Sequence, residues 1–416
     1  MARARTRLSL IARLVVPLVV LSACSSAVVG GAASEGGPAT AAPSTAAATH
    51  GDNHSQSTTP VESVESVTDS LAGGGSLVTV GFANGPYTPT AEAGGTDDYH
   101  CFLIDPAIAA DTFITGVRFN PGNASIVHHA ILFRVPPESV AAARAKDSQT
   151  PDEGWSCFGD TGIPDTSGDP LESLNNAPWL SAWAPGGKET LFARGTGVAM
   201  PAGTQVVLQM HYNLLAGDGP DNSGATLRLA KPGARLMPLE TMLLPAPVEL
   251  PCAEGHTGPL CDRDAAILDV TSRFGRGAFE TVGRLQLLCG GDAVSPKRGP
   301  TQMCDRYITD PITVVAAAGH MHLLGQSIRI DKVSGDGTVT TLIDKPVWDF
   351  DDQSSTVLPK PVTIQRGERL RVTCTHDATL RDKIPSLQGL PDRYVVWGEG
   401  TSDEMCLGIV TLLGTT

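Results

Sequence analysis

A stretch of seven residues, Gly319-His320-Met321-His322-Leu323-Leu324-Gly325, places two histidines in an otherwise apolar part of the chain. The apolar residues 312–318 precede it and residues 326–330 follow it, so the run predicts one buried β-strand with this stretch in its middle. Residues two apart on a strand project from the same face. We therefore expect His320 and His322 to lie side by side, either as half of a metal site or as two hydrogen-bonded structural histidines.

The first 23 residues have the pattern of a secretory signal peptide. Arg3, Arg5 and Arg7 form a basic start, residues 8–21 are mainly apolar, and the segment ends in Leu21-Ser22-Ala23-Cys24. These four residues resemble a bacterial lipobox, which predicts cleavage before Cys24, a lipid on its sulfur, and an extracytoplasmic protein anchored to the bacterial cell membrane. Ordinary cleavage nearby, with Cys24 removed or left free, is the alternative.

Residues 24–76 are predicted to form a disordered tether. Residues 25–76 are rich in Ser, Ala, Gly, Thr and Pro and contain no aromatic residue, Lys or Arg, so they cannot bury enough apolar surface to order themselves. The chain has a formal net charge of −14, and loss of the signal peptide removes four arginines and no acids. Such an acidic chain repels nucleic acid and anionic headgroups, so we expect no nucleic-acid partner and membrane contact through the lipid alone. The pattern gives no oligomeric state.

Nine cysteines occur, and eight remain when Cys24 is set aside. An even number in an exported chain predicts four disulfides formed in an oxidising compartment. Spacing alone does not choose among the possible pairings. No two cysteines are separated by two residues, so a cysteine-type zinc site is not expected.

From residue 77 onward, short β-rich runs alternate with Gly/Pro turns. The runs are 77–82, 113–119, 126–135, 206–214 and 225–229, and later 312–330, 338–343, 362–364, 369–375 and 394–397. Only residues 136–149 and 264–274 predict helices. This pattern indicates an all-β fold of antiparallel sandwiches or jelly rolls. We expect two β-sandwich domains, residues 77–235 and 236–416, with the Pro-rich stretch 236–251 as the boundary region.

Two further histidines are adjacent, His128 and His129, in the apolar run 126–133. Neighbouring residues on a regular strand point to opposite faces, so both imidazoles reach one metal only if the strand is bulged or ends there. The preceding Pro121-Gly122-Asn123 favours such an irregularity. Otherwise one histidine belongs to the core and the other to the surface.

Two more donors are candidates to complete these groups. Alternation along residues 206–213 places Gln209 and His211 on one face. His211 is therefore a candidate third imidazole for His128 and His129, with Gln209 as a hydrogen-bond partner behind it.

Met405 is a candidate partner for the pair at 320 and 322. A thioether is a soft ligand that suits Cu(I), although a lone methionine more often belongs to the core.

The motifs VHHAILF, LQMHYN, GHMHLLG and TSDEMC occur in this order. Together they resemble the copper type II, ascorbate-dependent monooxygenases, a family that includes dopamine β-monooxygenase and peptidylglycine α-hydroxylating monooxygenase. The likeness runs from about residue 97 to 413, with further matches in DYHC at 98–101, WDFDDQ at 348–353 and RVTC at 371–374.

The resemblance implies two jelly-roll domains that each carry one copper and face each other across an open, water-filled cleft. It assigns His128, His129 and His211 to the electron-donating copper, and His320, His322 and Met405 to the copper that binds O₂. It further implies that a reductant such as ascorbate loads both coppers. A C–H bond of a small organic substrate, with amines among the candidates, is then hydroxylated, and the second electron comes from the other domain.

The family pattern would pair Cys101 with Cys157, and Cys374 with Cys406. The second bond would fix the residue next to Met405. By proximity we assign Cys252–Cys261 and Cys289–Cys304, two pairs whose members are exchangeable on spacing alone.

The chain departs from the peptide-amidating branch of the family. There an Arg, an Asn and a Tyr hold the substrate, whereas the matching positions here are Ala318, Leu407 and Ile409, so amidation is not expected. Asp403 and Glu404 remain beside the expected copper site, either facing an amine or in structural turn roles. The remaining histidines of the folded part, His100, His256 and His376, are expected to be structural or exposed.

Two other functions are alternatives to a monooxygenase. One is a copper-binding lipoprotein that stores, senses or buffers copper, which the missing substrate-holding residues favour. The other is a zinc hydrolase, since three histidines suit zinc. That alternative leaves Met405 unexplained and has no obvious general base in the sequence.

Overall fold

The computed structural model describes residues 75–91, 96–150, 153–164, 172–215 and 217–414. These residues all belong to one compact unit, Val61–Thr416. The predicted signal peptide, Cys24 and nearly all of the predicted tether lie outside the described residues. Within them, no helix is long and apolar enough to cross a membrane.

Residues 76–229 form ten strands. They are β1 (Ser76–Gly81), β2 (Asp97–Ile104), β3 (Thr112–Asn120), β4 (Val127–Val135), β5 (Trp155–Ser156), β6 (Trp179–Trp183), β7 (Thr190–Leu191), β8 (Thr196–Met200), β9 (Gln205–Asn213) and β10 (Gly224–Leu229). The helical segments among them are η2 (Pro137–Ser139), α2 (Val140–Asp147) and α3 (Glu172–Asn175). The five runs that the sequence predicts here coincide with β1, β3, β4, β9 and β10 to within one residue at each end.

Residues 237–413 form ten more strands. They are β11 (Met237–Pro245), β12 (Glu249–Leu250), β13 (Thr301–Tyr307), β14 (Ile312–His320), β15 (Gly325–Val333), β16 (Val339–Lys345), β17 (Thr356–Ile364), β18 (Arg369–His376), β19 (Val395–Val396) and β20 (Leu407–Leu413). The helical segments are η3 (Pro259–Cys261), α4 (Arg263–Phe274), α5 (Arg276–Leu288), η4 (Ala378–Asp382) and η5 (Pro385–Leu387). The described chain is therefore mainly β, as the sequence predicts.

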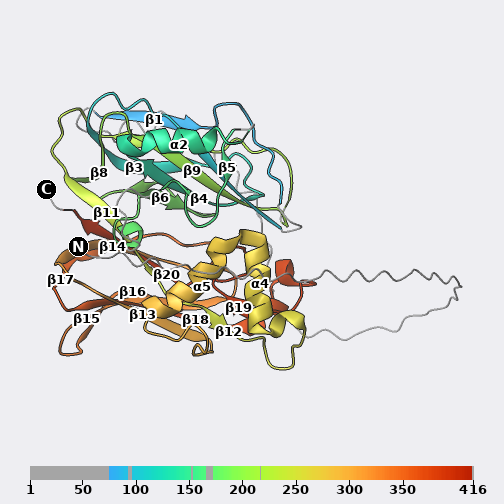
Figure 1. Ribbon diagram of the computed structural model, residues 1–416. Helices are drawn as coiled ribbons and strands as arrows, with labels where there is room; N and C mark the ends of the chain where they lie inside the picture. The colour runs from blue at the N-terminus through green and yellow to red at the C-terminus, as the bar shows by residue number, and fades with distance from the viewer. Residues whose placement is uncertain (1–74, 92–95, 151–152, 165–171, 216, 415–416) are drawn as a thin grey trace, which may run out of the picture. The chain divides into compact units, whose positions relative to one another are not determined.

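Nearly all strand pairs are antiparallel. A five-stranded sheet has the order β5-β2-β9-β4-β6, a four-stranded sheet the order β13-β18-β15-β16, and β12 pairs with β19. The largest sheet runs β1-β10-β3-β8-β11-β20-β14-β17, with β7 beside β3. Figure 1 labels most of its strands, among them β1, β3 and β8 of the first half and β14, β17 and β20 of the second. The exception to antiparallel pairing among the described strands is β8 with β11.

Two large hydrophobic cores lie on this long sheet. In the first core, one end of the long sheet, formed by β1, β10, β3 and β8, packs against β2, β4 and β9 of the five-stranded sheet. Side chains such as Val206, Leu208 and Met210 form this core. The second joins β11, β20 and β14 to β15 and β18 of the four-stranded sheet, through side chains such as Val410, Ile330 and Val372. Each core thus lies between two sheets, as in a β-sandwich.

The Pro-rich boundary expected at 236–251 is instead largely strand. Strand β11 pairs in parallel with β8 at Met237 and Pro238 and antiparallel with β20 over Leu239–Pro245, so the sheet continues through this region. Its two prolines lie near the ends of the strand, where a missing N–H is tolerated. Strand β11 nevertheless contributes to both cores, because Leu239 belongs to the first core and Met242 to the second.

Two helices follow each other in the second half, where the sequence predicted one. Helix α4 matches the prediction, whereas α5 was missed. Gly275, with φ of 78°, ends α4 and begins α5. Gly277 and Gly283 lower the helix propensity of this segment, but Val282 and Leu285 pack into the second core and stabilise it. Tertiary burial therefore outweighs local propensity in α5.

Four disulfides link the described cysteines: Cys101–Cys157, Cys252–Cys261, Cys289–Cys304 and Cys374–Cys406. They coincide with the four pairs named from the sequence. Such bonds persist in oxidising compartments, so they indicate an extracytoplasmic protein. Two of them lie on or beside strands that carry histidines, since Cys101 lies on β2 beside β9, and Cys374 lies on β18, which ends at His376.

Candidate metal centre

The adjacent histidines lie at a bulge in β4. Pairing with β9 runs from Val127 opposite Tyr212 to His129 opposite His211, and the register shifts between them. The backbone N–H groups of Ile126 and Val127 bond to the Asn123 carbonyl, which sets this irregular start. His128 is therefore the extra residue of the bulge. Both imidazoles can then turn toward the same side of the strand, as the sequence required for a shared metal.

Three histidines converge from β4 and β9. Nδ1 of His211 lies 3.0 Å from Nδ1 of His128 and 3.2 Å from Nδ1 of His129. One nitrogen from each ring falls within 4.8 Å of the other two. His128 and His211 are buried, and His129 is partly buried. The two short contacts are hydrogen bonds between ring nitrogens, whereas a shared cation would engage all three nitrogens.

Asp97 orients His211. The His211 Nε2–H group donates to Oδ1 of Asp97 at 2.8 Å, and the Thr401 hydroxyl donates to the same oxygen at 2.8 Å. Burial alone would raise the pKa of Asp97. The hydrogen bond and charge of His211, together with the hydrogen bond from Thr401, lower it by a larger amount, so the net pKa lies below the usual range. An ionised Asp97 keeps the proton of His211 on Nε2 and leaves the Nδ1 lone pair facing the other two rings.

Gln209 does not have the role expected from the sequence. Its amide nitrogen lies 3.5 Å from Sγ of Cys157 and 3.4 Å from the carbonyl oxygen of Asp160. Alternation placed Gln209 correctly on the His211 side of β9, but a strand rises more than 6 Å over two residues. The side chain therefore reaches the disulfide rather than the imidazole. The partner behind His211 is Asp97, 114 residues away in the chain.

His320 and His322 lie at the end of a strand, not in the middle of one. Strand β14 ends at His320, and β15 begins only at Gly325 after a turn. The two rings are nevertheless close, with centroids 5.1 Å apart. Nδ1 of His320 lies 2.6 Å from Oε1 of Gln353, and Nδ1 of His322 donates to the Asp403 carbonyl at 3.3 Å. The Nε2 atom of His322 is buried without a hydrogen-bond partner.

The strand register places the backbone of Met405 beside that of His322. Strands β14 and β20 are antiparallel with His320 opposite Leu407, so continuing the register places Met405 opposite His322. The Glu404 carboxylate accepts the backbone N–H of His322 at 2.9 Å and that of Leu324 at 2.5 Å, which fixes the two segments together. The Met405 side chain is 7% exposed and belongs to the second core.

Asp403 and Glu404 have structural partners. Asp403 pairs with Arg273 at 2.7 Å and with Arg393 at 3.1 Å. Besides accepting three backbone N–H groups, Glu404 lies 3.4 Å from Nε2 of His376, a buried histidine that also approaches the Met405 carbonyl at 3.2 Å. Both carboxylates are therefore engaged by the protein, which leaves neither of them to recognise an amine.

The two histidine groups pack against each other. The rings of His129 and His320 have centroids 5.9 Å apart, and Phe350 stacks on His128 at 4.8 Å. The Tyr99 hydroxyl donates to the Glu399 carbonyl at 2.5 Å. The structure thus shows direct ring contact between His129 and His320 where the resemblance implies an open, water-filled cleft.

Burial keeps most of these imidazoles neutral. It lowers the pKa of His128 and of His129 well below the ordinary value, and neighbouring histidines lower it further. The same causes lower the pKa of His320 to about 3, with His322 as the neighbour. Neutral imidazole is the form that binds metals. Imidazole nitrogens suit copper, zinc, iron and nickel, while a thioether narrows the choice toward Cu(I), so the donor types fit copper.

We expect Asp97→Asn to weaken metal binding at the three-histidine group. The variant replaces an ionised acceptor by a neutral one, and loss of such a partner typically costs about 10-fold to 100-fold in affinity. Competition of a chromogenic Cu(I) chelator with the protein measures the change. Asp111→Asn, at an exposed carboxylate that accepts the Ala202 N–H, is the matched control. Equal affinities in the parent and in Asp97→Asn would contradict the role given to Asp97.

The metal-free protein should lose stability as the pH falls below about 6.5. The unfolded chain takes up protons on its histidines there, whereas His128, His129 and His320 stay neutral when folded, so the unfolded state binds more protons. Each such group contributes about 1 kcal/mol per pH unit, and for His320 the window extends to about pH 3. Urea unfolding at pH 7, 6 and 5 in a chelator measures the slope. His320→Gln should give a shallower slope, and an unchanged one would refute the assignment.

Comparison with known proteins gives one family match and distant structural likenesses. The major capsid protein P2 from bacteriophage PM2 is 12% identical, with 82% of this chain and 97% of that chain covered and a TM-score of 0.30. An allantoicase is 15% identical, with coverage of 78% and 90% and a TM-score of 0.16. Residues 298–412, which include His320, His322 and Met405, match the family model of the copper type II ascorbate-dependent monooxygenase C-terminal domain.

Proposed function

We propose that this protein is a copper-dependent monooxygenase that hydroxylates a C–H bond of a small organic substrate with O₂ and a reductant such as ascorbate. The observation that carries the proposal is the convergence of His128, His129 and His211 beside a second histidine pair that lies within the family match. In this proposal His320, His322 and Met405 hold the copper at which the substrate is oxidised. The three-histidine group holds the second copper.

Copper in these groups would supply one-electron redox chemistry and a place for O₂ to react. The protein's part is to hold the donors. Asp97 fixes the tautomer of His211, and Gln353 holds Nδ1 of His320 so that Nε2 is left for a ligand. Glu404 and the Cys374–Cys406 bond fix both sides of Met405. Such support from neighbouring groups reduces the reorganisation needed when the ion binds.

The substrate proposal is limited to a small organic molecule. Ala318 and Ile409 are opposite each other on β14 and β20, and His320 and Leu407 are opposite each other two residues on. Ala318, Leu407 and Ile409 occupy the positions that bind a peptide carboxylate in the amidating branch. All three are apolar, so they give such a carboxylate no charged partner. An amine substrate loses support as well, because Asp403 and Glu404 are paired with protein groups.

The proposal also covers the organisation of the chain. We infer a signal peptide over residues 1–23, a lipid on Cys24 and a tether over residues 24–76. Two jelly-roll domains, 77–235 and 236–416, follow in this proposal. The two separate hydrophobic cores support the division into two folded parts, and four disulfides support an extracytoplasmic location. The anchor would hold the copper groups outside the membrane.

A non-catalytic copper-binding protein is the second candidate. The observation that favours it is the close packing between the groups, where Phe350 covers His128 and His129 contacts His320. The two functions differ in turnover. The copper-loaded protein with ascorbate and a panel of small amines and phenethyl compounds should consume O₂ and release a hydroxylated product. Stoichiometric copper uptake without ascorbate-coupled product across the panel would identify the binding protein instead.

Met405→Ile should abolish hydroxylation and leave copper at the three-histidine group largely intact. The variant removes the sulfur donor but keeps an apolar side chain of similar size, so the core is little disturbed. Copper content by elemental analysis, together with product formation, tests this expectation. Met303→Ile, at a half-exposed methionine on β13, is the control. Equal loss of copper from both groups in Met405→Ile would contradict the assignment.

Cys24→Ser should release the protein from the membrane. The variant lacks the sulfur that would carry the lipid, while a tether without Lys or Arg gives no electrostatic attachment. Detergent phase partitioning of cell extracts measures the change, with the parent in the detergent phase and the variant in the aqueous phase. Aqueous partitioning of the parent would contradict lipidation.

A further inference from the structure

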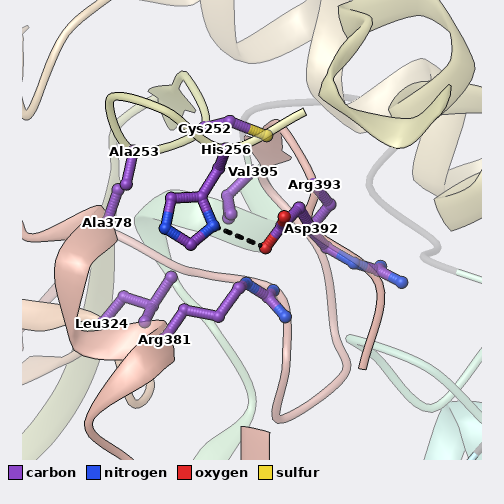
Figure 2. Close-up of a pocket in the computed structure, with 9 residues that line it drawn as sticks. All are labelled: Cys252, Ala253, His256, Leu324, Ala378, Arg381, Asp392, Arg393 and Val395. Atoms are coloured by element: carbon purple, nitrogen blue, oxygen red, sulfur yellow. Dashed lines mark hydrogen bonds and ion pairs between the residues drawn. The ribbon is translucent and has the colours of Figure 1, made fainter. Parts of the chain in front are cut away.

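A small cavity lies behind the loop that carries Met405. Figure 2 shows that residues from several segments line it, among them His256, Leu324, Arg381, Asp392 and Arg393. The cavity has room for about one water-sized group. None of these residues belongs to the two histidine groups, so the cavity is distinct from the candidate metal centre.

Arg381 is the unusual residue of this cavity. It lies in η4, and its side chain is only 7% exposed. Nη2 donates to the Ser402 carbonyl at 3.1 Å, while Nη1 is buried with no hydrogen-bond partner. Among the described residues, no carboxylate lies within 4.0 Å of its guanidinium group. Asp403, Asp392 and Asp382 act on this guanidinium group only from beyond contact distance. A buried cation without a counter-charge in contact is costly, so an anion beside Nη1 would stabilise it.

The acidic groups nearby are already engaged by other cations. Asp392 lies 3.0 Å from Nδ1 of His256, and Asp382 lies 3.1 Å from Nε2 of the same ring (Figure 2 shows the first contact). Arg393 pairs with Asp403 at 3.1 Å and with Asp269 at 2.9 Å, yet its Nε is also buried without a partner. Two guanidinium groups with unused N–H donors therefore line one cavity.

Solvent has access from the side of His256. That ring is 28% exposed and the Asp382 side chain is 53% exposed, whereas Arg381 lies deeper. The size of the cavity excludes phosphate esters and larger carboxylates. Burial further disfavours a multiply charged ion, because the desolvation cost rises steeply with charge. The ligand that fits is a single monovalent ion of about the size of water.

We propose that this cavity binds one small monovalent anion, such as chloride, with Nη1 of Arg381 as donor and Arg393 as a second positive group. Arg381 bonds to Ser402 and Arg393 to Asp403, so the anion would stabilise the loop that leads to Met405. The inference does not depend on the proposed oxygen chemistry, because it rests on residues outside the histidine groups and is tested on metal-free protein.

The test is thermal unfolding of the metal-free full chain in sodium chloride or bromide against sodium gluconate at equal ionic strength. The parent should show a saturable rise in the unfolding midpoint of about 3 °C at halide concentrations well above Kd. Arg381→Met should lose this rise and, in gluconate, unfold at the same temperature as the parent or higher, because the unpaired buried charge is gone. Arg366→Met, at a surface arginine that is 72% exposed, should keep the parent's rise.

A second measurement does not depend on the folding of a variant. Anomalous diffraction from parent crystals grown in bromide should place one bromide beside Nη1 of Arg381. No saturable halide effect, a halide effect that survives in Arg381→Met, or an empty cavity in the bromide crystals would each overturn the proposal.

Discussion

One buried oxygen atom, Oδ1 of Asp97, joins the two parts of the candidate centre. It accepts a hydrogen bond from His211 on β9 and another from Thr401 in the loop that leads to Met405. The same oxygen therefore sets the tautomer of His211 in the first group and holds the loop of the second group against it. Because Asp97 is the first residue of β2, its position is fixed by pairing with Asn213 at the end of β9. The geometry of the centre thus depends on strand register as much as on the histidines themselves.

The long sheet gives these contacts a common frame. Strand β11 is shared, since its start pairs with β8 of the first part and its remainder with β20 of the second. Strands β14 and β20, which lead to His320 and Met405, are the next strands in the same sheet. The three-histidine group lies on β4 and β9 of the five-stranded sheet, which packs on the long sheet through the first hydrophobic core. A displacement of one histidine group relative to the other would therefore have to disturb that core or the pairing within the long sheet. This explains how side chains far apart in sequence are held within contact distance.

Local alternation predicted many of the strands, whereas the grouping of His211 with His128 and His129, which joins distant segments, was implied by the family resemblance. A bulge at His128 was one of the two alternatives that the sequence left open, and the register shift in β4 selects it. Hydrogen-bond partners were harder to foresee. Asp97 lies 114 residues from His211, and no local pattern links them, so Gln209 was chosen for its place on the same face. Helix α5 was missed for a similar reason, as its stability comes from burial against the second core rather than from propensity.

Charge explains why each group has one buried carboxylate behind it. Neutral imidazoles supply no compensation for a cation in a low-dielectric interior, and burial lowers the pKa of His128, His129 and His320. Asp97 stands behind His211, and Glu404 stands behind His322 and Met405. Burial raises the pKa of Glu404, but His376 lowers it to a net value below the usual one, so this carboxylate is also ionised. Glu404 lies beside His376, and Asp97 lies beside His211 and the Thr401 hydroxyl. A cation in either group would therefore lie near a buried, ionised carboxylate, and a soft donor such as Met405 would suit Cu(I), the copper ion of smaller charge.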